Sequence, residues 1–262
     1  MHSATSIAFW RRLFHFRRTR SGFESSRYLL KWLLISVAIG LVAGVGALAF
    51  FEAIRLSTQF LLGKLVGYLP PDPLGEGTMG VMALWAAPRA WLLPVVTAAG
   101  GLLSGIIVFT LAPEAEGHGT DAAIAAFHQG KAIRARIPLV KLVASAITIG
   151  SGGSGGREGP AAQISAGFGS LLGNLLHLDI QDRRIAIATG IGAGIGAIFR
   201  APLGGAVLAA EILYKHDLEV EAIIPALIAS IVGYSVFGAW MGWTPIFVTS
   251  GNLAFTSPLQ LL

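Results

Sequence analysis

The sequence predicts an all-α membrane protein, built as a polytopic bundle of tilted and broken helices. Three observations support this class. Hydrophobic residues make up 54% of the chain and charged residues 13%, whereas soluble domains are about 45–50% apolar and about 25% charged. Several apolar runs reach the roughly 20 residues that cross a bilayer as a helix. The chain also contains 34 glycines, and small residues allow close helix packing in lipid.

Charge divides the chain into a tail and a membrane region. The first 31 residues contain seven Lys or Arg residues and one acidic residue, Glu24, so this segment has a charge of +6. Since the whole chain has a net charge of +5, the remaining residues sum to −1. A basic segment before a long apolar run is the positive-inside pattern. We therefore expect a cytoplasmic tail over residues 1–27, a transmembrane region over residues 28–262 in the cytoplasmic membrane, and no binding of nucleic acid.

The first two apolar runs predict membrane-spanning helices. The run from Tyr28 to about Leu65 is far longer than the ~7–15 residues of a signal-peptide core, which predicts one long tilted helix. Glu52 and Arg55 lie one helical turn apart near its end, where we expect them to pair. After a turn-rich loop, Trp91–Leu111 predicts the second span and returns the chain to the cytoplasm.

The middle of the chain predicts short and interrupted helices. A short helix is expected at Ala122–His128, with Thr120 or Asp121 as its N-cap. The apolar run Ile137–Ile149 is too short to cross a membrane alone, and helix is expected to resume at Pro160–Leu176. Broken helices occur at membrane depth only where protein buries the loosened backbone or where it lines a cavity.

The last third predicts three further helices. The polar connection Asp179–Arg184 is expected to provide an aspartate as a helix cap, followed by two arginines, and a glycine-rich helix is expected at Ile185–Phe199. Another helix restarts at Pro202 and carries Glu211 in apolar surroundings. Ala222–Trp240 predicts a final span.

The candidate functional site is the segment between the two interrupted helices. It contains a glycine-serine run, then Arg157 and Glu158, and then a helix that opens at Gly159 and Pro160. A helix N-terminus presents unpaired N–H groups and the positive end of its dipole, which together favour an anion. We therefore expect the amides of Arg157, Glu158 and Gly159 to bind an anion, as broken helices do in transporters.

Glu158 is the candidate gate of this site. An ionised carboxylate would occupy the site in place of an anion, whereas a protonated one would move away and admit the anion. Ionisable residues within membrane segments are usually functional. The structural alternative is that Glu158 and Arg157 only stabilise a buried turn.

Two motifs resemble those of the CLC family of chloride channels and proton-coupled chloride exchangers. They are GREGPAAQI at Gly156–Ile164 and FRAPLGGAVLAAE at Phe199–Glu211, and the resemblance covers Tyr28–Leu262. It implies that Glu158 is the gating glutamate, that the amides of residues 157–159 face the anion, and that Glu211 is a buried glutamate on a neighbouring helix.

The resemblance also sets expectations for the whole protein. Its substrate is expected to be chloride or a similar small anion, with protons as a further partner, and the protein is expected to be a lipid-embedded homodimer with one pore per subunit. Family members contain two inverted repeats, and this sequence resembles the N-terminal repeat alone, so we expect a truncated chain.

Three positions distinguish this sequence from the common family pattern. The segment Gly117–Asp121 is GHGTD where the family commonly has GSGIP, so His118 and Gly119 take the place of an anion-coordinating segment. Ile212 stands where proton-coupled members often have a proton-relay glutamate, and isoleucine cannot carry a proton. Pro160 resembles the chloride-type branch, because the fluoride-exporting branch resembles GREGT.

Two alternatives to an anion permease remain at this stage. Ser154 lies in a G-x-S-x-G pattern that also resembles the rhomboid intramembrane proteases, but such a serine needs a histidine base, and His177 and His216 lie at segment ends. The other alternative is an inactive half-protein. The glycine run lacks the G-K-[ST] of a phosphate-binding loop, and no paired histidines suggest a metal. We therefore expect that the protein is not an enzyme and that it binds no metal ion and no cofactor.

Overall fold

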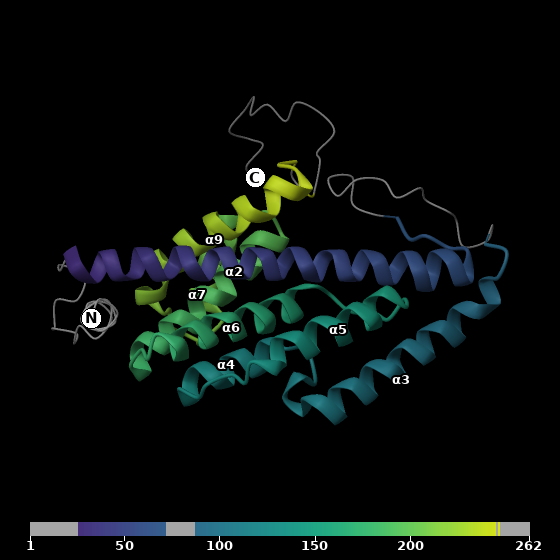
Figure 1. The fold of residues 1–262 in the computed structure, drawn as a ribbon, viewed down its shortest axis with the longest axis horizontal. Helices are drawn as coiled ribbons and strands as arrows, with labels where there is room; N and C mark the ends of the chain where they lie inside the picture. The colour runs from purple at the N-terminus through teal and green to yellow at the C-terminus, as the bar shows by residue number, and fades with distance from the viewer. Residues whose placement is uncertain (1–25, 72–86, 245, 247–262) are drawn as a thin grey trace, which may run out of the picture.

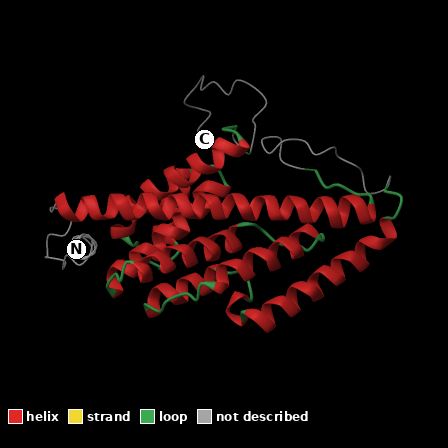
Figure 2. Ribbon diagram, in the orientation of Figure 1, coloured by secondary structure: helices red, strands yellow, loops and turns green. Residues whose placement is uncertain are grey.

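The computed structural model describes residues 26–71, 87–244 and 246. The described residues form eight α-helices and no β-strand (Figure 2). This confirms the all-α class expected from the composition. The basic tail over residues 1–25 lies outside the described residues, so its predicted position stays a prediction.

Helix α2 (Ser26–Thr58) runs along the long axis of the molecule (Figure 1). It continues without a break into a π-helical segment, η2 (Gln59–Val66), and together they provide an apolar span of 39 residues, Tyr28–Val66. The prediction of one long helix is confirmed. The expected pair is also present, with Arg55 Nη1 3.6 Å from Glu52 Oε1.

Two other helices among the described residues are long and apolar enough to cross a membrane. They are α3 (Leu93–Leu111), preceded by one 3₁₀ turn at Ala90–Leu92, and α9 (Val220–Met241). Helix α3 lies at the edge of the molecule (Figure 1), with only 11% of its apolar window buried. Its large exposed apolar side chains suit contact with lipid rather than water.

Five further helices complete the bundle and confirm the interrupted pattern. They are α4 (Thr120–Gln129), α5 (Arg136–Gly150), α6 (Glu158–Leu175), α7 (Ile180–Ile198) and α8 (Pro202–Glu211). Helix α7 is almost wholly buried and contacts α2, α4, α6, α8 and α9. Its glycines and alanines explain this central position, because small side chains let several helices approach one backbone.

Several helices begin earlier than the sequence predicted, and α7 differs most, since it begins at Ile180 rather than Ile185. Helix α6 begins at Glu158, two residues before Pro160, because proline is well tolerated in the first turn of a helix. Helix α4 begins at Thr120, and neither Thr120 nor Asp121 caps it, so that prediction is wrong. The Thr120 hydroxyl instead lies 3.0 Å from Nδ1 of His118.

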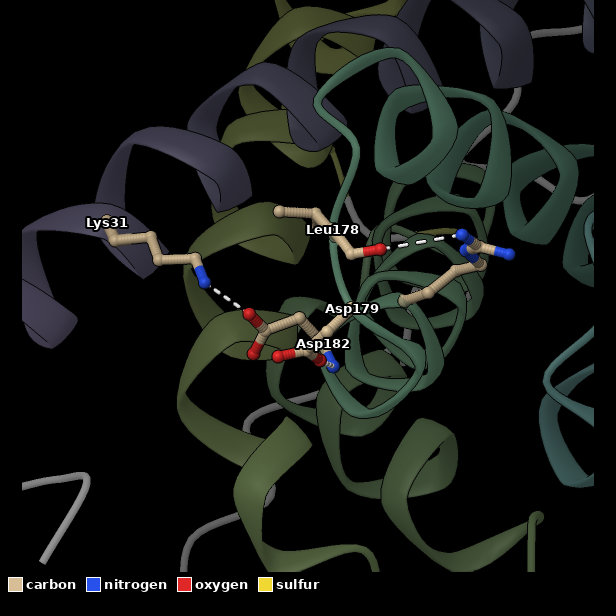
Figure 3. Close-up of polar contacts among 5 residues, drawn as sticks. Lys31, Leu178, Asp179 and Asp182 are labelled. Carbon is tan, nitrogen blue, oxygen red and sulfur yellow. Dashed lines mark hydrogen bonds and ion pairs between the residues drawn. The ribbon is translucent and has the colours of Figure 1, made fainter. Parts of the chain in front are cut away.

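A buried ion pair holds together the end of the bundle at which α2, α7 and α9 begin, which we call the tail end. Lys31 of α2 donates to the Asp182 carboxylate of α7 (Figure 3), and the Lys31 side chain is fully buried. The expected aspartate cap is confirmed beside it, and the structure assigns it to Asp179, whose Oδ1 accepts from the Asp182 amide at 2.8 Å. The cap fixes the first turn of α7 and therefore the position of the Asp182 carboxylate.

Removing the Lys31 charge should strongly destabilise the protein. Breaking a buried ion pair leaves an uncompensated charge and costs about 3–5 kcal/mol, so Lys31→Met should lower the midpoint of thermal unfolding, followed by circular dichroism in detergent. Lys64→Met, which removes an exposed lysine at the other end of the same continuous helix, is the matched control. A second change, Asp182→Leu in the Lys31→Met background, should recover much of the loss, and equal stability of Lys31→Met and the unmodified chain would contradict the role of the pair.

Candidate anion-binding site

The N-termini of α4 and α6 meet through glycines. A Cβ atom added to Gly159 would lie 2.6 Å from Cε1 of His118 and closer still to the carbonyl oxygen and Nδ1 of the same residue. A Cβ atom on Gly119, whose φ is +106°, would lie 2.8 Å from the carbonyl oxygen of Gly159. Only glycine permits this approach. The structure therefore brings together three predicted site residues, His118, Gly119 and Gly159.

Two buried polar side chains hold the loop that precedes α4. Lys141 of α5 is 4% exposed and its ammonium donates to the carbonyl oxygens of Ala115 at 3.0 Å and Gly117 at 2.6 Å. Gln163 of α6 is 2% exposed and its Nε2 donates to the carbonyl oxygen of Glu114 at 2.8 Å. Buried donors with these partners fix the backbone of the loop, and therefore the position of His118.

The sequence analysis did not identify Lys141 or Gln163 as functional residues. A signal was available for Lys141, since it is the only charged residue within the apolar run Ile137–Ile149, and a charge within such a run usually has a function or a specific partner. Gln163 lies in the GREGPAAQI motif itself, but nothing local indicates that its side chain reaches another loop.

The outer part of the same loop is held by an exposed ion pair. Arg134 donates to the Glu114 carboxylate, and this hydrogen bond lowers the pKa of Glu114 below its usual value. Both side chains are about half exposed, so water and salt screen the pair. The stabilisation from this shift is present at neutral pH and is lost as the pH falls through the lowered pKa.

The Glu158 side chain folds back over Gly156 at the start of α6. A Cβ atom on Gly156 would lie 2.9 Å from Cδ of Glu158 and closer still to Oε2. The carboxylate therefore occupies space that any side chain at residue 156 would need. The neighbouring Arg157 guanidinium lies over the ring of Phe51 on α2, with Cζ 5.6 Å from the ring centroid.

The backbone of the site is buried, whereas its titratable side chains are more exposed to solvent. Gly119 and Gly159 are buried, Arg157 is half-buried, and His118 and Glu158 are exposed. The first-turn amides of a helix have no partner within the helix. The arrangement therefore presents two helix N-termini and an imidazole beside a carboxylate that is open to approach.

Glu211 does not occupy the buried position that the resemblance implied. It is exposed at the last residue of α8. The buried residues of this helix are Gly205, Ala206, Ala209 and Ala210, and with 3.6 residues per turn Glu211 falls on the opposite side. The prediction of a buried Glu211 is wrong for this reason. Ile212, directly after the helix, is half-buried.

The structure does not support a serine protease or a metal site. Ser154 precedes the N-terminus of α6, whereas His177 follows its other end, so the 18 residues of α6 separate them by about 27 Å. His216 lies in the exposed connection between α8 and α9. Among the described residues, no group of three or more histidine, aspartate or glutamate side chains could hold a metal ion.

These features define a class, a multi-pass helical membrane protein whose broken helices bring their N-termini together. The family model for voltage-gated chloride channels matches residues 100–262. The chain therefore belongs to the CLC family, whose named members here are channels and transporters rather than enzymes.

Individual relatives agree with this assignment. An uncharacterised protein of Methanocaldococcus jannaschii is 31% identical over 80% of this chain and 44% of its own length. The H⁺/Cl⁻ exchange transporter ClcA of Citrobacter koseri is 28% identical over 88% of this chain and 46% of its own length. The crystal structure of a CLC-type fluoride/proton antiporter, 20% identical, superposes with a TM-score of 0.67 over 88% of this chain and 53% of the other. The chain thus spans about half the length of these relatives.

Adding a methyl group at Gly159 should disturb the junction of α4 and α6. Gly159→Ala forces Cβ against His118, and overpacking of this kind costs about 1–3 kcal/mol. Gly105→Ala is the matched control, because a Cβ there meets nothing within 4 Å and alanine favours a helix interior over glycine by roughly 0.5–1 kcal/mol. Unfolding midpoints in detergent should therefore move in opposite directions, and a Gly159→Ala midpoint equal to that of the unmodified chain would show that the two helices can separate freely.

Proposed function

We propose that this chain forms part of a CLC-type anion permease in which chloride binds at the N-termini of α4 and α6 and Glu158 acts as the gate. One observation carries this proposal, namely the direct packing of His118 and Gly119 against Gly159, which brings two helix N-termini together beside the Glu158 carboxylate. Unpaired amides and aligned helix dipoles favour a small anion at such a junction.

Glu158 gates the site by competing with the anion. The ionised carboxylate lies at the N-terminus of α6 and takes the favourable electrostatic interaction that an anion would otherwise receive. On protonation it loses this interaction and leaves the space to chloride. The exposure of the side chain gives it both a route to protons and room to move.

His118 supplies a hydrogen-bond donor to the anion. Its Nδ1 lies 3.0 Å from the Thr120 hydroxyl, and a hydroxyl that donates to Nδ1 leaves the proton of a neutral imidazole on Nε2. The Nε2–H group is then the donor, in place of the serine hydroxyl of the common family pattern. Protonation of the ring adds a positive charge beside the anion and makes binding pH-sensitive.

Two residues bear on which anion is transported and on whether its transport is coupled to protons. Pro160, after Glu158-Gly159, resembles the chloride-type branch, and the Citrobacter relative is named as an H⁺/Cl⁻ exchange transporter. Ile212 provides no proton carrier at the position of the common relay glutamate. The proposed permease is therefore either a channel or an exchanger whose protons take another route. Measuring whether protons move during chloride flux distinguishes the two.

The proposed setting is a homodimer in the cytoplasmic membrane with the N-terminus in the cytoplasm. The concentration of positive charge in the first 31 residues supports this orientation. Because the chain spans about half the length of its relatives, the activity, the dimer and the membrane of the whole protein are part of this proposal, in which lipid surrounds helices such as α3.

Chloride efflux from liposomes that contain the purified chain tests the role of Glu158. Acidification should accelerate efflux through the unmodified chain, because it protonates the gate. Glu158→Gln should release chloride rapidly already at neutral pH and lose the part of the pH dependence that comes from the gate, since glutamine resembles the protonated acid, so that only the contribution of His118 remains. Glu52→Gln, at a half-buried glutamate paired with Arg55, is the control and should leave the dependence intact. The proposal is rejected if the unmodified chain releases chloride no faster than protein-free liposomes, or if Glu158→Gln keeps the same pH profile.

A further inference from the structure

Two arginines are held at opposite ends of a row of aromatic rings. Arg157 Cζ lies 5.6 Å from the Phe51 ring centroid, the Phe51 and Phe237 rings meet edge to face at 5.6 Å and 84°, and Arg200 Cζ lies 5.8 Å from the Phe237 centroid. The row joins the loop before α6, helices α2 and α9, and the turn between α7 and α8. Cation–π contacts hold both guanidinium groups in place.

The row lies away from the tail end, at the level where α7 and α9 end, which we call the far end; α2 and η2 continue beyond it to Val66. Phe51 is 20 residues beyond Lys31 on α2, a rise of about 30 Å, and Arg200 follows the last turn of α7, whose first turn holds Asp182. The first turns of α6 and the last turn of α7 share one apolar cluster with Phe237. Arg200 is therefore at the level of the proposed anion site, away from the start of α2.

Arg200 has an unusual backbone conformation. Its φ is +52°, and among the described non-glycine residues only His177 also has a positive φ. The left-handed region is rare for residues with a side chain, because it raises the conformational free energy. Such a residue stays there only where surrounding contacts hold it in place. Glycine would adopt the conformation without strain, so an arginine at residue 200 points to a contribution from its side chain.

Two contributions are consistent with the contacts of Arg200. Its Nη1 donates to the carbonyl oxygen of Thr244 and, at 3.1 Å, to the Thr244 hydroxyl, which ties the α7–α8 turn to the segment after α9. Its guanidinium also keeps a positive charge at every physiological pH. A structural tie needs only the hydrogen bonds, whereas an electrostatic role needs the charge.

We propose that Arg200 acts with Arg157 to form an electropositive approach at the far end, which gathers anions from solution and delivers them to the site at the N-terminus of α6. This inference rests on the proposed function. Fixed positive charges beside low-dielectric walls raise the local anion concentration and the rate of association. The row of Phe51 and Phe237 supplies such a wall and holds both charges in position.

The nearby charges are consistent with this role. Glu52 on α2 is paired with Arg55 at 3.6 Å, so its charge is offset locally. Glu158 carries a negative charge at the start of α6, and its proposed movement opens this position to an incoming anion. Arg200 is half-buried, so salt in the solution can screen its effect.

Ionic strength separates the electrostatic role from the structural tie. Initial chloride efflux should be measured at a fixed chloride gradient while an impermeant salt raises the ionic strength from about 0.01 M to about 1 M, which shortens the Debye length from roughly 30 Å to roughly 3 Å. Charge-lined clefts change association rates by about 10- to 1000-fold, so losing one of two charges in Arg200→Gln should slow efflux by at least about threefold at low salt. The difference should disappear at high salt, and Arg200→Lys should retain most of the rate.

A second variant keeps the tie and cancels the charge. Thr244→Asp places a carboxylate beside the Arg200 guanidinium, where it accepts the existing hydrogen bond, so it should slow efflux at low salt while the unfolding midpoint stays the same or rises. This variant also tests the proposal if Arg200→Gln does not fold. Lys215→Gln, which removes an exposed positive charge from the loop between α8 and α9, is the matched control.

The outcomes distinguish this inference from the proposed function. Loss of rate in Arg200→Gln to the same extent at low and high salt, or normal rates in Thr244→Asp at low salt, would identify Arg200 as a structural tie and overturn the inference alone. If the unmodified chain moves no chloride, the proposed function fails and the inference fails with it. A low-salt defect in both variants, with none in Lys215→Gln, supports it.

Discussion

The first-turn amide groups of α4 and α6, which have no partner within their own helices, impose the constraint on which the centre of the fold depends. Hydrocarbon offers no partner to a backbone N–H group, so a helix that begins within a membrane bundle must face protein, water or a ligand. Here the two N-termini face each other, with His118 packed on Gly159. The surrounding glycines are a consequence, since any larger residue would push the two backbones apart.

The same constraint explains why an apolar bundle contains buried polar side chains. Lys141 and Gln163 donate hydrogen bonds to carbonyl oxygens of the loop before α4, and these bonds keep the irregular backbone in one conformation. At the tail end, the pair of Lys31 and Asp182 has a different role, because it joins the first turns of two long helices. One end of the bundle is thus fixed by a buried ion pair, while the far end combines aromatic rings with cations.

Several local features were predictable because they depend on residues close in sequence. The long first helix, the Asp179 cap and the pairing of Glu52 with Arg55 follow from apolar run length, capping preference and helical spacing. The cap of α4 was mispredicted, since the Thr120 hydroxyl meets His118 instead of the first-turn amides. Glu211 was misplaced because the resemblance carried no information about which face of α8 is buried in this chain.

The sequence by itself determined that this is a helical membrane protein, where its helices are interrupted, and which short motifs resemble the CLC family. Hydrophobicity, helical spacing and glycine content act locally, so they can be read from neighbouring residues. Only the tertiary structure decided that His118 lies on Gly159, that the Glu158 carboxylate folds over Gly156, and that Lys141 reaches the loop before α4. These contacts join segments far apart in the chain, and their geometry follows from the packing of whole helices rather than from any local pattern.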